Sequence, residues 1–397
     1  MRVLHVNKFL YRRGGAEGYL LDLADLQRGS GHEVEYWGMD HPDNQRPLPL
    51  EDTFPSHIEL EPPPGGLAAI GAGARMVWSR QSRRGLARAL TRFAPDVVHC
   101  HNIYHQLSPS ILAATRAAGV PVVMTLHDYK LACPSYQMLD DGRPCDACVG
   151  HSTLPAVRRR CKSGSLSASG LLAVESGIHR LIGAYDGVDA FVSPSRFLAG
   201  VMERAGIDRS RLHVVPHFIR AEATVQAAAD DAELAGATPG VVFAGRLSHE
   251  KGVDTLVEAA ALAPEVPVHI AGDGPERPAL ERIVAACVAT VVPSRWYENQ
   301  PMTILESYAA AVPAVVTSLG GSPELVEDGG DGIVVPPDDA PALAAAMSRL
   351  AADPAGARAM GRAGQARLLD RHSPERHLAA LDELYDAVIG RRVGGAA

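Results

Sequence analysis

The sequence predicts an α/β protein made of two Rossmann-like domains, each with a doubly wound parallel sheet. Short β-branched apolar runs alternate with stretches of helical periodicity, which is the pattern of βαβ units around parallel sheets. The alternation occurs twice, on either side of an Ala- and Asp-rich stretch at 221–240 that lacks strand character. The length of 397 residues also exceeds what one hydrophobic core usually organises.

The composition is that of a folded, soluble chain. Apolar residues make up 46% and charged residues 21% of the sequence, which excludes disordered and fibrous proteins. The formal net charge of −8 argues against a nucleic-acid partner. No apolar run is long enough to span a membrane, and the apolar stretch at the N-terminus is too short for a signal peptide. We therefore expect a cytoplasmic protein.

The first series of elements occupies residues 1–216, which we expect to form one domain. A Pro-rich, acidic loop is expected at Asp40–Gly66, and an arginine-rich helix at Leu67–Phe93. These arginines fit either a solvated helix face or contact with an anionic acceptor or a membrane surface. The predicted strands are Arg2–Asn7, His32–Trp37, Val97–His101, Val122–Leu126, Ala190–Ser193 and His213–Val215, and the other helices are Ala16–Gln27, Ser108–Ala118 and Arg196–Ala205.

The second series begins after a boundary placed between Pro216 and Gly240, and gives a domain over residues 217–373. After Pro337 the pattern is helical, with breaks at Pro354 and Pro374. We expect the last helix, within 374–397, to pack back on the first domain. The predicted strands of this half are Val241–Ala244, Val266–Ala271, Thr290–Val292, Ala314–Thr317 and Gly332–Val335.

Two turns at strand ends have the composition of phosphate sites. Gly14 and Gly15 lie between the first strand and a helix, where glycine allows close backbone approach and the helix N–H groups attract anions. A glycine pair also fits a simple tight bend. Arg246 and Lys251 follow the strand that ends at Ala244. A guanidinium fork with an ammonium nearby suits a diphosphate, so we expect phosphate binding there.

A third candidate is the segment 294–306, which carries Glu298 and Glu306 around a predicted helix start at Pro301. The N–H groups of Met302 and Thr303 would then be available to an anion. Carboxylates near a bound sugar nucleotide can accept hydrogen bonds from vicinal hydroxyls. On spacing alone, two exposed helix carboxylates would be the favoured interpretation.

Together these motifs resemble one family. In order they are Gly14-Gly15, Leu126-His127-Asp128, Ser193-Pro194-Ser195-Arg196, Gly245-Arg246 with Lys251-Gly252, Gly272-Asp273-Gly274-Pro275, and Glu298 with Glu306 in the segment that starts Ser294-Arg295-Trp296. On them the chain is similar to glycosyltransferase family 4, whose members are retaining enzymes of the GT-B architecture, with two Rossmann-like domains facing a deep cleft. The similarity covers nearly the whole chain.

The resemblance implies that a nucleotide-diphosphate-sugar donor binds mainly to the second domain, and that its sugar is transferred with retained anomeric configuration. Cations and helix N–H groups would stabilise the leaving diphosphate, with no cofactor or metal required for catalysis. The acceptor would be a carbohydrate, lipid-linked or small molecule held by the first domain, with peripheral membrane contact as a further expectation. The implied catalytic residues are His127, Glu298, Arg246 and Lys251, and the implied donor contacts are Gly14, Gly15, Arg246, Lys251, Asp273, Asn299, Gln300, Met302, Thr303 and Glu306.

One departure from the family pattern concerns the second domain. Only about fifteen residues join Pro275 to Thr290, so roughly 25 residues, about one strand-and-helix unit, are missing. In the doubly wound order 3-2-1-4-5-6 the missing strand is the third, an edge strand, and the rest of the sheet can form without it. The nucleotide base usually packs near that strand in the family. The alternative function is therefore a catalytically impaired homologue that serves as a binding partner.

Four cysteines form a second distinctive feature, with eleven, two and twelve residues between them. A C-x2-C pair with two more thiols fits a structural zinc site that fixes the loop after His127. Reduced or loosely paired thiols fit the same spacing. The candidate ligands are Cys133, Cys145, Cys148 and Cys161.

Overall fold

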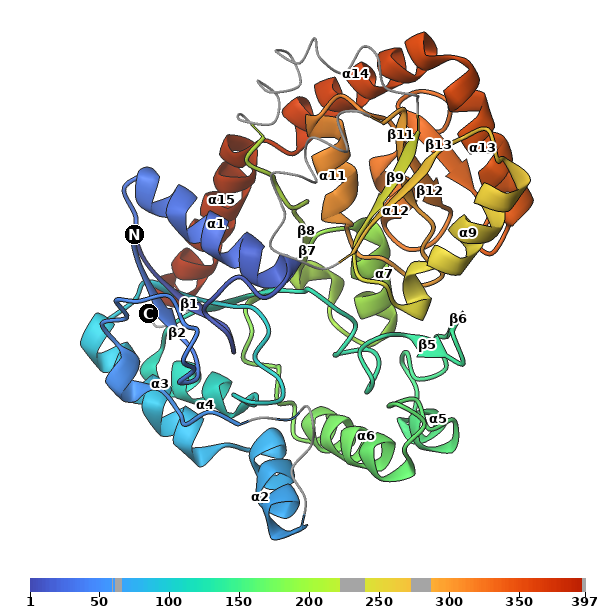
Figure 1. Ribbon diagram of the computed structural model, residues 1–397. Helices are drawn as coiled ribbons and strands as arrows, with labels where there is room; N and C mark the ends of the chain where they lie inside the picture. Colours follow the sequence, from blue (N-terminus) through green and yellow to red (C-terminus); the bar gives the residue numbers. More distant parts are fainter. Residues whose placement is uncertain (59, 61–65, 222–239, 273–286, 395–397) are drawn as a thin grey trace.

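The computed structural model describes residues 1–58, 60, 66–221, 240–272 and 287–394, and two parallel sheets organise them (Figure 1). The first is six-stranded, in the order β2-β1-β3-β4-β7-β8. The second has five described strands, in the order β10-β9-β11-β12-β13. All the pairings within these two sheets are parallel. The α/β fold class predicted from the alternating pattern is confirmed.

The first sheet is built from strands close to those predicted. Its strands are β1 (Arg2–Val6), β2 (Glu33–Trp37), β3 (Val97–Cys100), β4 (Val122–Thr125), β7 (Ala190–Ser193) and β8 (Leu212–Val214). The helices of this half are α1 (Gly15–Gly29), α2 (Gly66–Val77), α3 (Arg80–Phe93), α4 (Ser110–Ala118), α5 (Leu154–Arg158), α6 (Leu166–Leu181) and α7 (Arg196–Arg204). Short 3-10 turns η1 (Glu51–Thr53) and η2 (Arg209–Arg211) and an antiparallel hairpin, β5 (Leu139–Asp140) with β6 (Arg143–Pro144), complete it.

The second sheet carries the remaining elements. Its strands are β9 (Val241–Ala244), β10 (Val268–Ala271), β11 (Ala289–Val292), β12 (Ala314–Thr317) and β13 (Gly332–Val335). The helices are α9 (Val253–Leu262), α11 (Met302–Ala309), α12 (Ser322–Leu325), α13 (Ala340–Ala352), α14 (Pro354–Arg371) and α15 (Pro374–Gly394), with a 3-10 turn η4 (His249–Lys251). Numbered along the chain, the described strands follow the doubly wound order without its third strand. Consistent with an edge position, β10 has exposed residues at His269 and Ile270.

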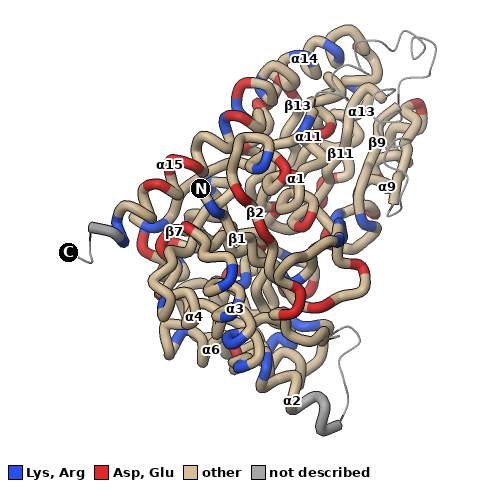
Figure 2. The backbone as a smooth tube through the Cα atoms, turned by 90° about the vertical axis from the view of Figure 1, so that its left-hand side faces the viewer, with Lys and Arg blue, Asp and Glu red and all other residues tan. Residues whose placement is uncertain are grey.

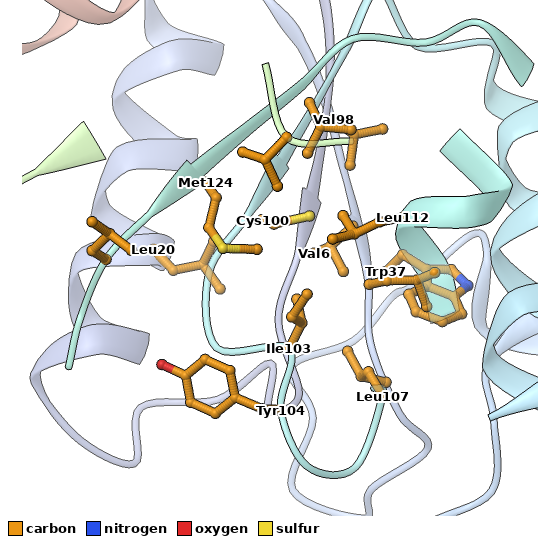
Figure 3. Packing of buried hydrophobic residues seen from close by; sticks show 14 of the residues in the cluster. Val6, Leu20, Trp37, Val98, Cys100, Ile103, Tyr104, Leu107, Leu112 and Met124 are labelled. Atoms are coloured by element: carbon orange, nitrogen blue, oxygen red, sulfur yellow. The ribbon is translucent and has the colours of Figure 1, made fainter. Parts of the chain in front are cut away.

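Alternating side chains of the first sheet pack into two hydrophobic cores, one on each face of the sheet. Leu4 and Val98 lie in a cluster that also contains residues of α3 and α4. Figure 3 shows Val98, Trp37 and Leu112 of this cluster. Val3 lies in a second cluster, on the other face, with residues of α1 and α15. The period-2 geometry of a strand explains this division, because neighbouring residues face opposite sides. The last helix, α15, thus packs on the N-terminal sheet beside α1 (Figure 1).

Two parts of the N-terminal half differ from the expectation. Leu67–Phe93 is two helices rather than one, because the buried Ser79 caps α3: its hydroxyl accepts a hydrogen bond from the backbone N–H of Ser82 at 3.1 Å. The stretch after His127, expected as a long loop, contains the β5–β6 hairpin and the helices α5 and α6. Across the described residues, every helix is too short or too polar to traverse a lipid bilayer.

Candidate active site

An ion pair forms the centre of the site. Lys251 ends η4, just after β9, and its Nζ lies 2.7 Å from Oε1 of Glu298, which follows β11. The backbone requires glycine after Lys251, since Gly252 has φ +67° and a Cβ there would lie 2.0 Å from the carbonyl oxygen of Pro293. The two strand ends therefore hold a cation and a carboxylate together, as expected for neighbouring parallel strands.

The charge of Glu298 depends on its partners. Burial alone would raise the pKa of this carboxyl group. The ammonium of Lys251 and hydrogen bonds from Lys251 and Ser294 outweigh burial and hold the pKa of Glu298 below its ordinary value. Glu298 is therefore ionised at neutral pH.

The next residue joins the two halves of the molecule. Asn299 donates from Nδ2 to the backbone carbonyl of His127, which follows β4 of the other sheet, at 2.7 Å. Its Oδ1 is buried and has no hydrogen-bond partner among the described residues. We call this meeting point of the residues after β4 and after β11 the junction. An amide oxygen at the junction is thus available to accept a hydrogen bond from a ligand hydroxyl.

A second contact across the halves was missed in the sequence. The carboxylate of Glu324 accepts hydrogen bonds from the backbone N–H groups of Arg196 and Phe197 at 2.8 and 2.6 Å. These N–H groups begin α7, so the carboxylate caps a helix of the opposite half and interacts with its dipole. The only sequence signal was the Ser195 N-cap, which marks the helix start but not its distant partner.

The other predicted donor contacts belong to the turn after β9 and to α11, apart from Asp273 and the residues treated separately. Arg246 is exposed and forms an ion pair at 3.6 Å with Glu250, the residue before Lys251. Thr303 Oγ1 lies 3.5 Å from the carbonyl of Ala244, at the end of β9. Met302 and the half-buried Glu306 belong to the same helix, α11. Asp273 lies outside the described residues.

Gln300, predicted as a donor contact, is hydrogen-bonded to the segment that leaves the first sheet. Its Oε1 accepts from the N–H of His217 at 2.8 Å, and its Nε2 donates to the carbonyl of His217 at 3.1 Å. Both polar atoms thus hold the segment that leaves the first sheet. We call this pair of hydrogen bonds between Gln300 and the backbone of His217 the Gln300 clamp.

The glycine pair begins α1, as predicted. Gly15 is the first residue of the helix, and Gly14 is its N-cap. One turn later the ring of Tyr19 packs edge-on against the ring of His127, with centroids 5.6 Å apart. The start of α1 therefore lies close to the junction.

A chain of imidazoles runs from His127 into the N-terminal core. His127 Nε2 is 3.0 Å from Nδ1 of His101, and His101 Nε2 is 3.0 Å from Nδ1 of His5. His5 Nε2 lies 2.6 Å from Oε1 of Gln27, whose Nε2 donates to Tyr385. Burial lowers the pKa of His127 to about 3 and that of His5 to about 4, and it holds the pKa of His101 well below its usual value. The rings are therefore neutral at neutral pH.

The side-chain amide of Gln27 fixes the direction of the hydrogen bonds along this row of imidazoles. Gln27 Oε1 can only accept, so the proton of His5 is on Nε2, and the same logic places the protons of His101 and His127 on Nε2. We expect two-bond ¹H–¹⁵N spectra of histidine-labelled protein to show His127 as the Nε2–H tautomer. Gln27→Met, which removes the acceptor, should give a mixture of tautomers, whereas Gln27→Glu should keep the native one. An Nδ1–H tautomer for His127 in the wild type would contradict this chain.

Family models match both halves of the chain. A model described as Glycosyltransferase Family 4 matches residues 13–223, more than half of the chain, and one described as Glycosyl transferases group 1 matches residues 277–353. The chain belongs to Glycosyltransferase Family 4. It is therefore a glycosyltransferase, and the family suggested by the sequence motifs is confirmed.

Curated relatives of this family-4 chain are also glycosyltransferases. It is 26% identical over 431 aligned positions to D-inositol 3-phosphate glycosyltransferase of Pseudarthrobacter chlorophenolicus, a match that covers 96% of this chain and 92% of the relative. It is 27% identical to alpha-maltose-1-phosphate synthase of Mycolicibacterium smegmatis over 76% of this chain and 84% of that one. A shorter match to alpha-D-kanosaminyltransferase of Streptomyces kanamyceticus is 36% identical over 29% of this chain, and it spans 37% of that relative.

Solved structures share the fold. Sucrose-phosphate synthase from Thermosynechococcus elongatus superposes with a TM-score of 0.68 at 18% identity, covering 100% of both chains. Anabaena Alr3699/HepE in complex with UDP gives a TM-score of 0.64 at 16% identity, covering 98% of this chain and 100% of the other. These similarities show the GT-B fold of this glycosyltransferase.

Proposed function

We propose that this glycosyltransferase transfers a sugar, of the hexosyl class or related to it, from a nucleotide-diphosphate donor with retention of anomeric configuration. The observation that carries the proposal is the Lys251–Glu298 pair at the junction, one residue from the Asn299 contact with His127. In the reaction the bond from the anomeric carbon to the diphosphate breaks, and a bond to an acceptor oxygen forms. The acceptor's proton leaves with the departing diphosphate.

The chain's own groups have the charges that this reaction needs. Lys251 and Arg246 are the cations beside β9, and the N-terminus of α11 adds backbone N–H groups at Met302 and Thr303. Preorganised positive groups stabilise the negative charge that develops on a leaving diphosphate. A carboxylate at Glu298 or Glu306 would bind sugar or ribose hydroxyls, and this division of roles requires no catalytic metal.

The donor is proposed to be a UDP-, GDP- or ADP-linked sugar, and a binding screen tests the choice. Titration calorimetry with the three donors should detect binding of at least one, and mass spectrometry of reaction mixtures should detect a glycosylated product. Binding of a UDP-sugar would agree with the UDP complex of Anabaena HepE. Absence of binding by all three would favour the alternative, an impaired homologue that acts as a binding partner.

The Arg246→Ala variant tests the diphosphate site. Because Arg246 is exposed and its described ion pair is only with the nearby Glu250, its loss should leave the urea midpoint unchanged. Turnover of the donor should fall about 100-fold or more, as for loss of one preorganised donor to a developing anion. Arg349→Ala removes an exposed arginine from α13 and serves as the control. Equal turnover of the three proteins would refute the assigned site.

The acceptor stays a prediction, as does the membrane contact. Figure 2 shows positively charged segments along α3, where the five arginines are exposed. A second candidate surface lies on α6, where Leu171, Val174 and Leu181 are exposed on one face. Basic residues and exposed apolar residues are the two features by which a protein surface binds anionic membranes, so the two surfaces together support a lipid-linked acceptor.

A further inference from the structure

The four clustered cysteines line a single small cavity. Its volume is about 10 Å³, which is room for one water-sized occupant. Most of the other lining side chains are apolar, among them Met138 and Val149. Packing of apolar side chains around a pocket of this size does not require thiols. Four of them nevertheless converge on it, and the first and last are 28 positions apart in the sequence. The converging thiols are Cys133, Cys145, Cys148 and Cys161.

Backbone hydrogen bonds fix the backbone of three of the four cysteines, each in a separate turn. The N–H of Cys133 donates to Tyr129 at 2.7 Å, and that of Cys161 to Ala156 at 3.1 Å. The N–H of Cys145 donates to Met138 at 2.8 Å, across the β5–β6 hairpin. The four side chains are therefore held around the cavity by the local fold and by no disulfide.

We propose that these four cysteines bind one Zn²⁺ ion as a tetrahedral thiolate site. Each thiol loses its proton to solvent as its sulfur binds the metal, at about 2.3 Å. The resulting site carries a net charge of two minus. Arg159, whose Nη1 lies 3.3 Å from Cys145 Sγ, would offset part of that charge.

A competing set of ligands lies elsewhere in the molecule. Among the described residues, His5, His99 and His101 form the one group of three possible ligands whose ligand atoms all lie within 4.8 Å of one another. The sulfur atoms of the four cysteines are therefore farther apart than these nitrogens. The histidine nitrogens are already paired with one another and with Gln27, Tyr385 and Thr125. A metal there would break buried hydrogen bonds of all three rings. At the thiols it would draw side chains into a cavity, and the contacts of Cys133 with Ser135 and of Cys145 with Arg159 can persist because a thiolate still accepts hydrogen bonds.

The zinc site would fix a loop that reaches the second half of the molecule. The tip of the hairpin, Gly142, has φ +74°, and a Cβ there would lie 2.2 Å from Nε2 of His249. His249 begins η4, the turn that ends at Lys251. A link between the zinc site and the active site rests on the proposed function, whereas zinc binding itself does not depend on that function.

Metal analysis tests the proposal on the whole chain, purified under reducing conditions with zinc supplied. About one zinc per chain is expected. Replacement by Co²⁺ should give the absorption bands of a tetrahedral thiolate complex. The double variant Cys145→Ser/Cys148→Ser should lose the metal, and Cys287→Ser, outside the cluster, should keep it.

Several results would overturn it. They are a zinc-free wild-type protein under these conditions, iron in place of zinc, a Cys145–Cys148 disulfide found by mass spectrometry, and equal zinc in the double variant. The wild-type measurement does not depend on whether the double variant folds. Donor binding measured on the same samples is a separate readout, so failure of the zinc proposal and failure of the proposed function are distinguishable.

Discussion

The Lys251→Met protein is expected to turn over its sugar-nucleotide donor about 10²–10³-fold more slowly than the wild type. The ammonium of Lys251 does two things in this structure. It neutralises the buried Glu298 at 2.7 Å, and under the proposed function it supplies positive charge to the leaving diphosphate. Methionine keeps most of the side-chain volume but supplies neither. Steady-state kinetics with the donor identified by calorimetry measure the effect.

Two comparisons separate the lost charge from a damaged fold. Removing Lys251 leaves burial as the dominant influence on Glu298, so the pKa of this carboxyl group should rise and the group should take up a proton more readily. Arg358→Met, an exposed change on α14, is the matched control and should retain full activity. Lys251→Met with wild-type kcat/KM would remove Lys251 from the reaction.

The strands could be predicted because their sequences decide them locally. Runs such as Val122–Thr125 and Ala314–Thr317 are buried on both faces, and their β-branched residues are the direct sign of that environment. The helix α6 was not predicted, because its sequence lacks a local signal of helical structure. It contains Gly170 and Gly177, and apolar residues occupy its exposed face as well as its buried one, so no amphipathic period marks it.

The candidate site was predictable only in part. Glycine and cation motifs at strand ends pointed to Lys251 and Glu298, because parallel strands bring their carboxyl ends to one edge. The clamp of Gln300 on His217 and the cap of Glu324 on α7 join residues at least 83 positions apart. Such contacts depend on how the two halves pack, which no local periodicity encodes.

The largest stability effect is expected at a buried ion pair behind the junction. Lys130 Nζ lies 2.7 Å from Oε2 of Glu175 on α6, and His105 Nδ1 lies 2.9 Å from Oε1. Burial alone would raise the pKa of Glu175, but Lys130 and His105 outweigh it and lower the pKa to about 2. Lys130→Met should therefore destabilise the protein by about 3–5 kcal/mol, because it leaves a buried carboxylate without its cation. Urea unfolding monitored by circular dichroism measures the loss.

A second variant shows whether the lost stability comes from the unpaired charge. Lys130→Met/Glu175→Leu removes both ions, and it should recover most of the stability, since apolar replacements of buried pairs are often neutral. In the wild type, the depressed pKa of Glu175 adds to the free energy of unfolding at pH values above 4.5, the usual pKa of a glutamate. This contribution is lost as the pH falls toward 2. The double variant should lack that pH-dependent loss. If the single variant unfolded at the wild-type midpoint, the pair would contribute nothing, and Glu175 would have to be neutral in the folded protein.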